Sequence, residues 1–311
     1  MSILLLFLVD LQKYSMTSVL KVLFLITLFL VVMILWVLRW FSLYQDYQLS
    51  DRQLLKKLQS IDEQASIKTH YDAQGHILRY AELGTPWLQT ILFIHGTPWS
   101  ILDAIPFLEK TNVLLNYHVI VPDRPWFWWS HWFGAVSDIE TQSDYLAELL
   151  YLTWNSHKVD VVWWSYAGAL LPIMTAKNQQ KVNSMIIIAW TMDPDNQTIW
   201  QISYLLHYTA LRFIMPQFLR VTNIEKLYSI QELNNATWFR SKITVPVALI
   251  HWYKDRIVKI ENTLYAKKML TNSSKVIMEL LPDDGHEIPI TNPFVIIHML
   301  ESLDTNILQT D

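Results

Sequence analysis

The sequence has no cysteine and little charge. Because none of its 311 residues is Cys, the chain forms no disulfide, thiolate metal site, cysteine nucleophile or lipidated cysteine anchor. The cysteine content therefore does not indicate whether the protein lies in an oxidising or a reducing compartment. Charged residues make up 17% of the chain and the formal net charge is −4, so nothing in the composition favours a nucleic-acid partner. The histidines show no metal-ligand spacing of the HExxH type, and we expect neither a metal nor a cofactor.

Glycine is also scarce, whereas tryptophan is abundant. The chain has 6 Gly and 15 Trp, although glycine alone makes up about 7% of an average protein. Added together, the two residue types reach an ordinary share of the chain. This imbalance matters because several of the tryptophans lie in the candidate site.

One long apolar run lies near the N-terminus. Residues 22–38 carry no charge, and flanking residues extend the run to the roughly 20 residues that cross hydrocarbon. We predict an N-terminal tail over 1–18, a single-pass transmembrane anchor over 19–42 and a linker helix over 43–65. A cleaved signal peptide is the alternative, but no small-x-small cleavage site follows. Basic residues on both sides leave the orientation in the membrane open.

Short apolar runs alternate with helical patterns from residue 66 onward. Runs that are apolar at every position are typical of parallel strands buried on both faces. We expect an α/β core over 66–192 and 243–311. Residues 193–242 are more chain than a crossover needs, so they predict a helical cap. We expect the aromatic residues of this cap to pack onto the sheet domain rather than to contact a membrane.

A serine lies where a strand is followed by a helical pattern. The strand 159–163 runs into the sequence WWSYAG at 163–168. A sharp turn with a central serine between a strand and a helix is a nucleophile elbow. It raises the hydroxyl above the sheet edge and directs the helix N-terminus at developing negative charge. We predict Ser165 as the nucleophile and the N–H of Tyr166 as an oxyanion donor, although a serine in this position often only caps a helix.

Four other segments extend this pattern. HGTP at 95–98 and DRP at 123–125 each follow a predicted strand, Asp255 lies in HWYKDRIV, and His286 lies in DGHE. Over roughly residues 65–305, the sequence resembles the α/β-hydrolase superfamily, with its HGxP, DRPGxG, HGxxDxxV and GGH segments. The resemblance implies a mostly parallel eight-stranded sheet with helices on both faces and a small helical cap.

The resemblance also implies a role for each residue. Ser165, Asp255 and His286 occur in the superfamily's order. Neutral His286 would take the proton of Ser165 and return it to the leaving group, and Asp255 would hold the imidazole tautomer. The N–H of Thr97 would be the other oxyanion donor, because the proline after it has none. Asp193 is an alternative acid.

These residues predict a serine hydrolase that cleaves an ester, thioester or amide through an acyl-enzyme on Ser165. The cap and the anchor favour a small acyl substrate that is apolar or lipid-like, with membrane contact through residues 19–42. Two alternatives stay open. A prolyl-type aminopeptidase would need acidic cap residues, here Glu225 and Glu232, to hold the substrate amine. The chain could also be a catalytically inactive binding protein with the hydrolase fold.

The match departs from the superfamily where its motifs favour glycine. The departures are Trp99, Trp126, Trp128, Trp163, Trp190 and Trp252. Glycine suits such positions because the backbone is left-handed or a helix approaches closely. We interpret these residues as glycines misrendered in translation, since UGA encodes Trp in some genetic codes and Gly in others. The competing interpretation is a genuine tryptophan-rich protein that has lost activity.

Overall fold

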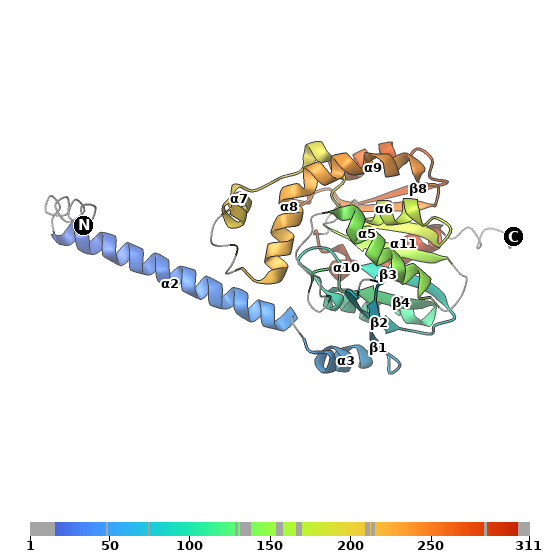
Figure 1. Cartoon of the computed structure of the whole chain (residues 1–311), viewed down its shortest axis with the longest axis horizontal. Coiled ribbons are helices and arrows are strands. Elements are labelled where there is room, and N and C mark those ends of the chain that lie inside the picture. The colour runs from blue at the N-terminus through green and yellow to red at the C-terminus, as the bar shows by residue number, and fades with distance from the viewer. Residues whose placement is uncertain are drawn as a thin grey trace. The chain divides into compact units, whose positions relative to one another are not determined.

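The structure is a computed structural model of the whole chain (Figure 1). It describes residues 16–47, 49–73, 75–127, 130, 138–153, 158–165, 170–208, 212, 215–282 and 285–303. The chain separates into two compact units, Met1–Ser50 and Asp51–Asp311.

The described part of the first unit is dominated by one long helix, α2 (Met16–Tyr47). Its segment Thr17–Val37 has a mean hydropathy of 2.8 and no buried residue. This length and composition suffice to cross a bilayer, and a signal sequence has the same character. The predicted linker helix over 43–65 instead holds the end of α2 and a separate helix, α3 (Asp51–Gln59). Leu54 and Leu58 of α3 are buried, so this helix belongs to the second unit.

The second unit is built on an eight-stranded sheet in the order β1-β2-β4-β3-β5-β6-β7-β8. The strands are β1 (Ser66–Tyr71), β2 (Ile77–Leu83), β3 (Gln89–Ile94), β4 (Tyr117–Pro122), β5 (Val159–Trp164), β6 (Val182–Ile188), β7 (Val247–Trp252) and β8 (Val276–Leu281). The pairs β1–β2 and β2–β4 are antiparallel, and the other pairs are parallel. The predicted mostly parallel sheet is confirmed.

Helices cover both faces of this sheet. They are α4 (Ile105–Thr111), α5 (Ile139–Ala147), α6 (Leu170–Lys177), α9 (Glu261–Met269), α10 (Ile288–Thr291) and α11 (Phe294–Leu303). Short 3-10 helices are η1 (Ile101–Ala104), η2 (Val113–Leu115), η3 (Glu148–Tyr151), η4 (Pro194–Asn196) and η6 (Ala236–Lys242). Buried side chains of α5, α6 and α9 share one cluster with alternate residues of β5. Helix α11 contacts α4, β6 and β7, and its buried residues lie outside that cluster, on the opposite face.

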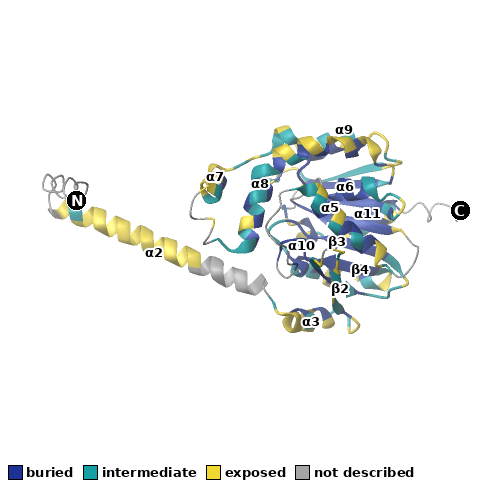
Figure 2. Cartoon of the chain, in the orientation of Figure 1, coloured by how far each residue is buried: buried dark blue, intermediate teal, exposed yellow. Residues whose placement is uncertain are grey.

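The core is centred on the parallel strands. Every residue of β5 is buried, which explains why its sequence is apolar without alternation except at Asp160, whose carboxylate accepts hydrogen bonds from Asn183 and Ser184. Figure 2 shows the central strands in the buried colour and the outer sides of the surrounding helices as exposed. Because the carboxyl ends of parallel strands meet at one edge of the sheet, loops far apart in the sequence come together there.

Two helices, α7 (Gln201–Tyr208) and α8 (Gln217–Asn235), lie between β6 and β7. They fall within the predicted cap over 193–242. Helix α8 buries Phe218, Val221 and Leu233 and contacts α7. The expectation that the aromatic residues of the cap pack onto the sheet domain is wrong for α7, because Tyr204 and Tyr208 are exposed.

Candidate active site

Ser165 directly follows β5 and has a left-handed backbone, with φ at 64°. Its N–H donates to the carbonyl of Ile188 at 2.8 Å, which ties the turn to the neighbouring strand. A residue with a β-carbon rarely adopts this conformation, which stores strain of the order of 1–2 kcal/mol. A strained turn at the end of a buried strand is the geometry expected of a nucleophile elbow.

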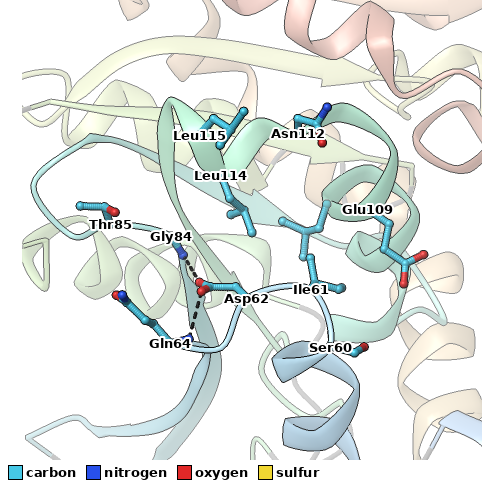
Figure 3. A pocket seen from close by; sticks show the side chains of 11 residues that line it. Ser60, Ile61, Asp62, Gln64, Gly84, Thr85, Glu109, Asn112, Leu114 and Leu115 are labelled. Atoms are coloured by element: carbon cyan, nitrogen blue, oxygen red, sulfur yellow. Dashed lines mark hydrogen bonds between the residues drawn. The ribbon is translucent and has the colours of Figure 1, made fainter.

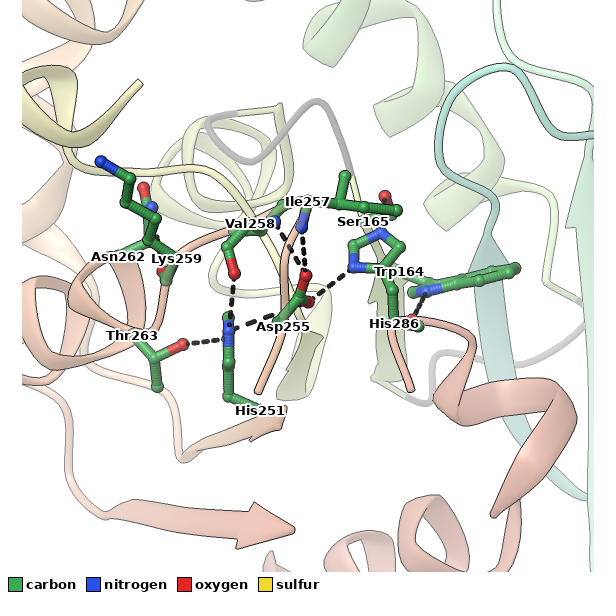
Figure 4. Close-up of polar contacts among 10 residues, drawn as sticks. All are labelled: Trp164, Ser165, His251, Asp255, Ile257, Val258, Lys259, Asn262, Thr263 and His286. Carbon is green, nitrogen blue, oxygen red and sulfur yellow. Dashed lines mark hydrogen bonds and ion pairs between the residues drawn. The ribbon is translucent and has the colours of Figure 1, made fainter. Parts of the chain in front are cut away.

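Three side chains from the loops after β5, β7 and β8 form a hydrogen-bonded line. The Ser165 hydroxyl oxygen lies 2.6 Å from His286 Nε2, and His286 Nδ1 lies 2.6 Å from Asp255 Oδ2. The other oxygen of Asp255 accepts the N–H groups of Ile257 at 2.7 Å and Val258 at 2.9 Å. Figure 4 shows the imidazole between the hydroxyl and the carboxylate. The structure therefore brings together the three residues singled out from the sequence.

The electrostatics of this line favour a charged acid and an oriented base. The side chain of Asp255 is 0% exposed. Its burial alone would raise its pKa, but the hydrogen bond and charge of His286 and the N–H groups of the following turn outweigh that effect and lower the pKa below 3.8. Asp255 is therefore a carboxylate at neutral pH. It can accept the Nδ1–H of His286, which leaves Nε2 free of hydrogen and facing the hydroxyl.

A second histidine, His251, lies beside Asp255 and binds the loop that carries it. His251 Nε2 lies 3.9 Å from Asp255 Oδ2, and its N–H donates to the carbonyl of Val258 at 3.1 Å. The other ring nitrogen accepts the hydroxyl of Thr263 at 2.7 Å. Burial lowers the pKa of His251, so the ring is a neutral support for the acid loop. In the sequence, His251 stands out only as the first residue of the HWYKDRIV segment.

The HGTP loop touches the elbow. A β-carbon at Gly96 would lie 2.6 Å from the carbonyl oxygen of Trp164 and 2.7 Å from the β-carbon of Ser165. Only glycine permits this approach. His95 donates from Nδ1 to the carbonyl of Gly96 at 2.7 Å and accepts the N–H of Arg124 at 3.0 Å. Burial and then the charge of Arg124 lower the pKa of His95 to about 3, so this ring is also neutral.

Thr97 is held by a buried ion pair that reaches the cap. Arg124 pairs with Glu225 of α8, and both side chains are buried. The hydroxyl of Thr97 donates to Glu225 at 2.7 Å and accepts from Arg124 at 2.8 Å. The cap helix is thereby fastened to the loop that carries the predicted oxyanion donor. No local sequence pattern points to this contact, and from the sequence Glu225 was expected only as a possible partner for a substrate amine.

One predicted residue, Asp193, is not brought to this line. Both oxygens of Asp193 accept hydrogen bonds from Asp195 and Asn196 next to it, and Asp255 fills the place beside His286 Nδ1. Asp193 therefore caps η4 instead of serving as the alternative acid. Tyr166 lies outside the described residues. Among the described residues, no group of three His, Asp or Glu side chains is arranged to hold a metal ion.

This chain is similar to known proteins in its structure. No protein-family model matches this chain, and no curated protein sequence does so either. A protein of Acinetobacter baumannii AYE assigned as a lipase aligns over 83% of this chain and 98% of its own, at 14% identity and a TM-score of 0.64. The chain has the α/β-hydrolase fold. A bacterial membrane phospholipase A aligns over 90% of this chain and 98% of its own, at 16% identity and a TM-score of 0.60.

Esterases of the same fold are also similar. An aryl esterase assigned in Burkholderia cenocepacia aligns over 76% of this chain and 97% of its own, at 20% identity and a TM-score of 0.61. These neighbours are enzymes of the α/β-hydrolase fold. At such low identity the likeness shows the fold of this chain, and the chemistry has to be argued from its own residues.

The tryptophans that replace motif glycines are mostly buried within this α/β-hydrolase fold. Trp126 has a left-handed backbone with φ at 66°. Trp163 and Trp190 are fully buried, and their indole N–H groups have no hydrogen-bond partner among the described atoms. Trp99 stacks on the ring of Trp164 with centroids 5.1 Å apart. Trp99 and Trp252 are partly exposed, and the indole N–H of Trp252 donates to the carbonyl of Pro282 at 3.3 Å. Trp128 lies outside the described residues.

A hollow of about 480 Å³ lies away from this site, between the end of α3 and the turn after β2 (Figure 3). Its lining includes Asp62, Gln64, Gly84 and Glu109. Asp62 accepts the N–H groups of Gly84 at 2.6 Å and Gln64 at 3.0 Å, so its carboxylate already serves the local turns. The hollow contains none of the three residues of the hydrogen-bonded line and is not a candidate active site.

Proposed function

We propose that this chain is a serine hydrolase that cleaves an ester, thioester or amide bond through an acyl-enzyme on Ser165. The observation that carries the proposal is the continuous line from the Ser165 hydroxyl through His286 to Asp255, with both links at 2.6 Å. A serine hydroxyl is a weak nucleophile until a base within hydrogen-bond reach takes its proton.

The reaction follows from these contacts. As the Ser165 oxygen attacks the substrate carbonyl carbon, its proton passes to His286 Nε2, and Asp255 stabilises the resulting imidazolium. When the tetrahedral intermediate collapses, His286 gives this proton to the departing alcohol, thiol or amine. A water molecule then attacks the acyl-enzyme with His286 again as base, and Ser165 is released with its proton restored.

The N–H groups of Thr97 and Tyr166 are proposed to bind the oxyanion. The contact between Gly96 and Ser165 supports the first assignment, because it holds the loop of Thr97 against the elbow. Such preorganised donors contribute about 3–4 kcal/mol each to the transition state. The buried pair of Arg124 and Glu225 then acts on the reaction indirectly, by fixing the side chain of Thr97.

The substrate is proposed to be an ester with an apolar or lipid-like acyl group. The apolar helix Thr17–Val37 and the likeness to a membrane phospholipase A support this class. The aminopeptidase alternative is disfavoured, because the carboxylate of Glu225 already binds Arg124 and Thr97. The pKa of Glu232, the other cap glutamate, is raised by burial, which makes it a poorer anion for an amine.

A fluorophosphonate probe tests the proposal, because it reacts only with an activated serine. Full-length chain with the written sequence and a version with glycine at the six motif positions are both treated with the probe. Labelling is expected in a folded version, abolished by Ser165→Ala and His286→Ala, and kept in Ser143→Ala, whose buried serine lies on α5. If neither version is labelled although both are folded by circular dichroism, Ser165 is not an activated nucleophile and the proposal fails.

A further inference from the structure

Helix α7 presents its apolar side chains to solvent. Ile202, Tyr204, Leu205 and Tyr208 are 49%, 47%, 50% and 72% exposed. The polar Ser203 is buried instead, and its carbonyl accepts the side-chain amide of Asn223 on α8 at 3.0 Å. A helix on a water-facing surface normally turns its apolar stripe inward and its polar face outward. On α7 most apolar side chains face outward instead, although the apolar Leu206 is partly buried and the polar Gln201 is exposed.

The four exposed residues form one continuous surface, which we call the α7 patch. At 3.6 residues per turn, Tyr204 and Tyr208 lie one above the other, Leu205 lies beside them, and Ile202 adjoins Leu205 one turn back. The residues on the other arc are Ser203, Leu206 and His207, which are buried or partly buried. Contiguous exposed apolar side chains of this kind mark a contact surface.

The charge pattern around α7 fits lipid. From residue 196 to residue 211 the sequence has no Asp, Glu, Lys or Arg, so no charge has to be desolvated when the patch leaves water. Tyrosine is favoured at the level of lipid headgroups, because its ring is apolar and its hydroxyl remains hydrated. Two tyrosines flanked by Ile and Leu match that environment.

We propose that the α7 patch inserts into the headgroup region of a lipid bilayer. The same chain carries Thr17–Val37, whose length and apolar composition fit a membrane span, so the bilayer is the apolar phase within reach of the domain. A second copy of the chain fits less well. A stable interface between proteins buries about 1,200–2,000 Å² in total, and four side chains of one eight-residue helix supply far less.

One consequence of this placement rests on the proposed function. Asn223, which holds α7, and Glu225, which contacts Thr97, lie two residues apart on α8. A cap that rests on the bilayer would therefore hold the Ser165 region near the lipid surface. Acyl esters that reside in the membrane would then be the substrates with the shortest path to the nucleophile.

Because the chain has no cysteine, a single introduced Cys can be labelled specifically to test whether the α7 patch contacts lipid. A thiol-reactive fluorophore is attached to the introduced cysteine of full-length Tyr204→Cys or Tyr208→Cys. Each labelled protein is placed in phosphatidylcholine vesicles, some of whose lipids carry a nitroxide quencher near the headgroup. Tyr71→Cys and Tyr253→Cys are matched controls, because these tyrosines are 62% and 58% exposed elsewhere on the domain. Nitroxide quenching at 204 and 208 is expected to be several-fold stronger than at 71 and 253.

Equal quenching at all four positions would overturn the proposal. A second copy of the chain as the occupant would give a different result. The fluorophore at 208 would then quench itself, this self-quenching would disappear when the protein is diluted among more vesicles, and nitroxide quenching at 208 would not exceed that at the control positions. That result would also overturn the membrane proposal. These readouts do not depend on Ser165, so they remain informative if the hydrolase proposal fails.

A kinetic comparison tests the link to substrate. The double variant Tyr204→Ser with Tyr208→Ser is expected to hydrolyse a vesicle-embedded ester about fivefold or more slowly than the unchanged chain, because it loses apolar insertion. Its rate on a soluble short-chain ester should stay unchanged. Tyr71→Ser should leave both rates unchanged. Equal losses on the two substrates would show that α7 acts only through folding and would contradict the membrane role.

Discussion

Simultaneous replacement of Trp126, Trp163 and Trp190 by glycine separates the two accounts of this tryptophan-rich core. All three indoles are fully buried. If they are native, each truncation costs about 3–5 kcal/mol, by analogy with large-to-small core substitutions. Three such losses amount to roughly 9–15 kcal/mol, which consumes the whole stability of about 5–15 kcal/mol of a typical domain. The triple variant would then be unfolded.

We expect the opposite result. Glycine relieves the left-handed backbone at Trp126, which costs about 1–2 kcal/mol with a β-carbon. It also removes the indole N–H groups of Trp163 and Trp190, which have no partner among the described atoms, at about 1–3 kcal/mol each. If glycine is the native residue, the neighbouring side chains are shaped to pack without the indoles and no cavity remains. The triple variant should therefore be the more stable protein.

Urea unfolding of both full-length proteins in the same detergent, followed by far-ultraviolet circular dichroism, measures the difference without relying on tryptophan emission. Trp164→Gly is the matched control, because Trp164 is equally buried but its indole N–H donates to the carbonyl of His286 at 2.9 Å. This control should lose about 3–5 kcal/mol. The reasoning would be refuted if the triple variant were unfolded or had a lower free energy of unfolding than the protein with tryptophan at the three positions. UGG codons at these positions would refute it as well.

Three other substitutions have measurable outcomes. Glu225→Ala removes the carboxylate that faces buried Arg124 and should lower the free energy of unfolding by about 3–5 kcal/mol; a loss under about 1 kcal/mol in urea titrations would argue against the buried pair. Asp255→Asn should lower ester turnover about 10⁴-fold, and unchanged turnover would remove Asp255 from the mechanism. Burial raises the pKa of Asp103 from 3.8 to about 7. Its stabilising contribution is therefore full below pH 3.8 and lost as the pH rises through about 7. Asp103→Asn should flatten this part of the stability curve, and a curve identical to that of the unchanged chain would contradict the assignment.

The sequence predicted the sheet from its apolar runs. Strands buried on both faces are mostly apolar, and in β5 and β7 Asp160 and His251 are the polar exceptions. The hydrogen-bonded line was predicted from the strand–turn–helix pattern at Ser165 and, for Asp255 and His286, from the resemblance to α/β-hydrolase motifs. The parallel sheet explains why these loops come together, because the carboxyl ends of its strands meet at one edge.

The contacts made by the cap could not be predicted in this way. The pair of Arg124 and Glu225 joins a loop after β4 to a helix about a hundred residues later, and no local pattern states which buried cation a helical glutamate will meet. The sequence of α7 likewise reveals an apolar arc but not whether that arc is covered. Whether an arc is covered depends on how α7 packs against α8, where Asn223 selects the face that carries Ser203.

The close approach at Gly96 couples the positions of two turns at one edge of the sheet. Its missing side chain lets the turn after β3 approach the end of β5, where an added β-carbon would lie 2.6 Å from the carbonyl oxygen of Trp164 and 2.7 Å from the β-carbon of Ser165. Even a methyl group there would wedge the two turns apart. The turn after β3 and the residue that carries the hydroxyl therefore cannot move independently, so evolution can reposition one of them only by moving the other as well.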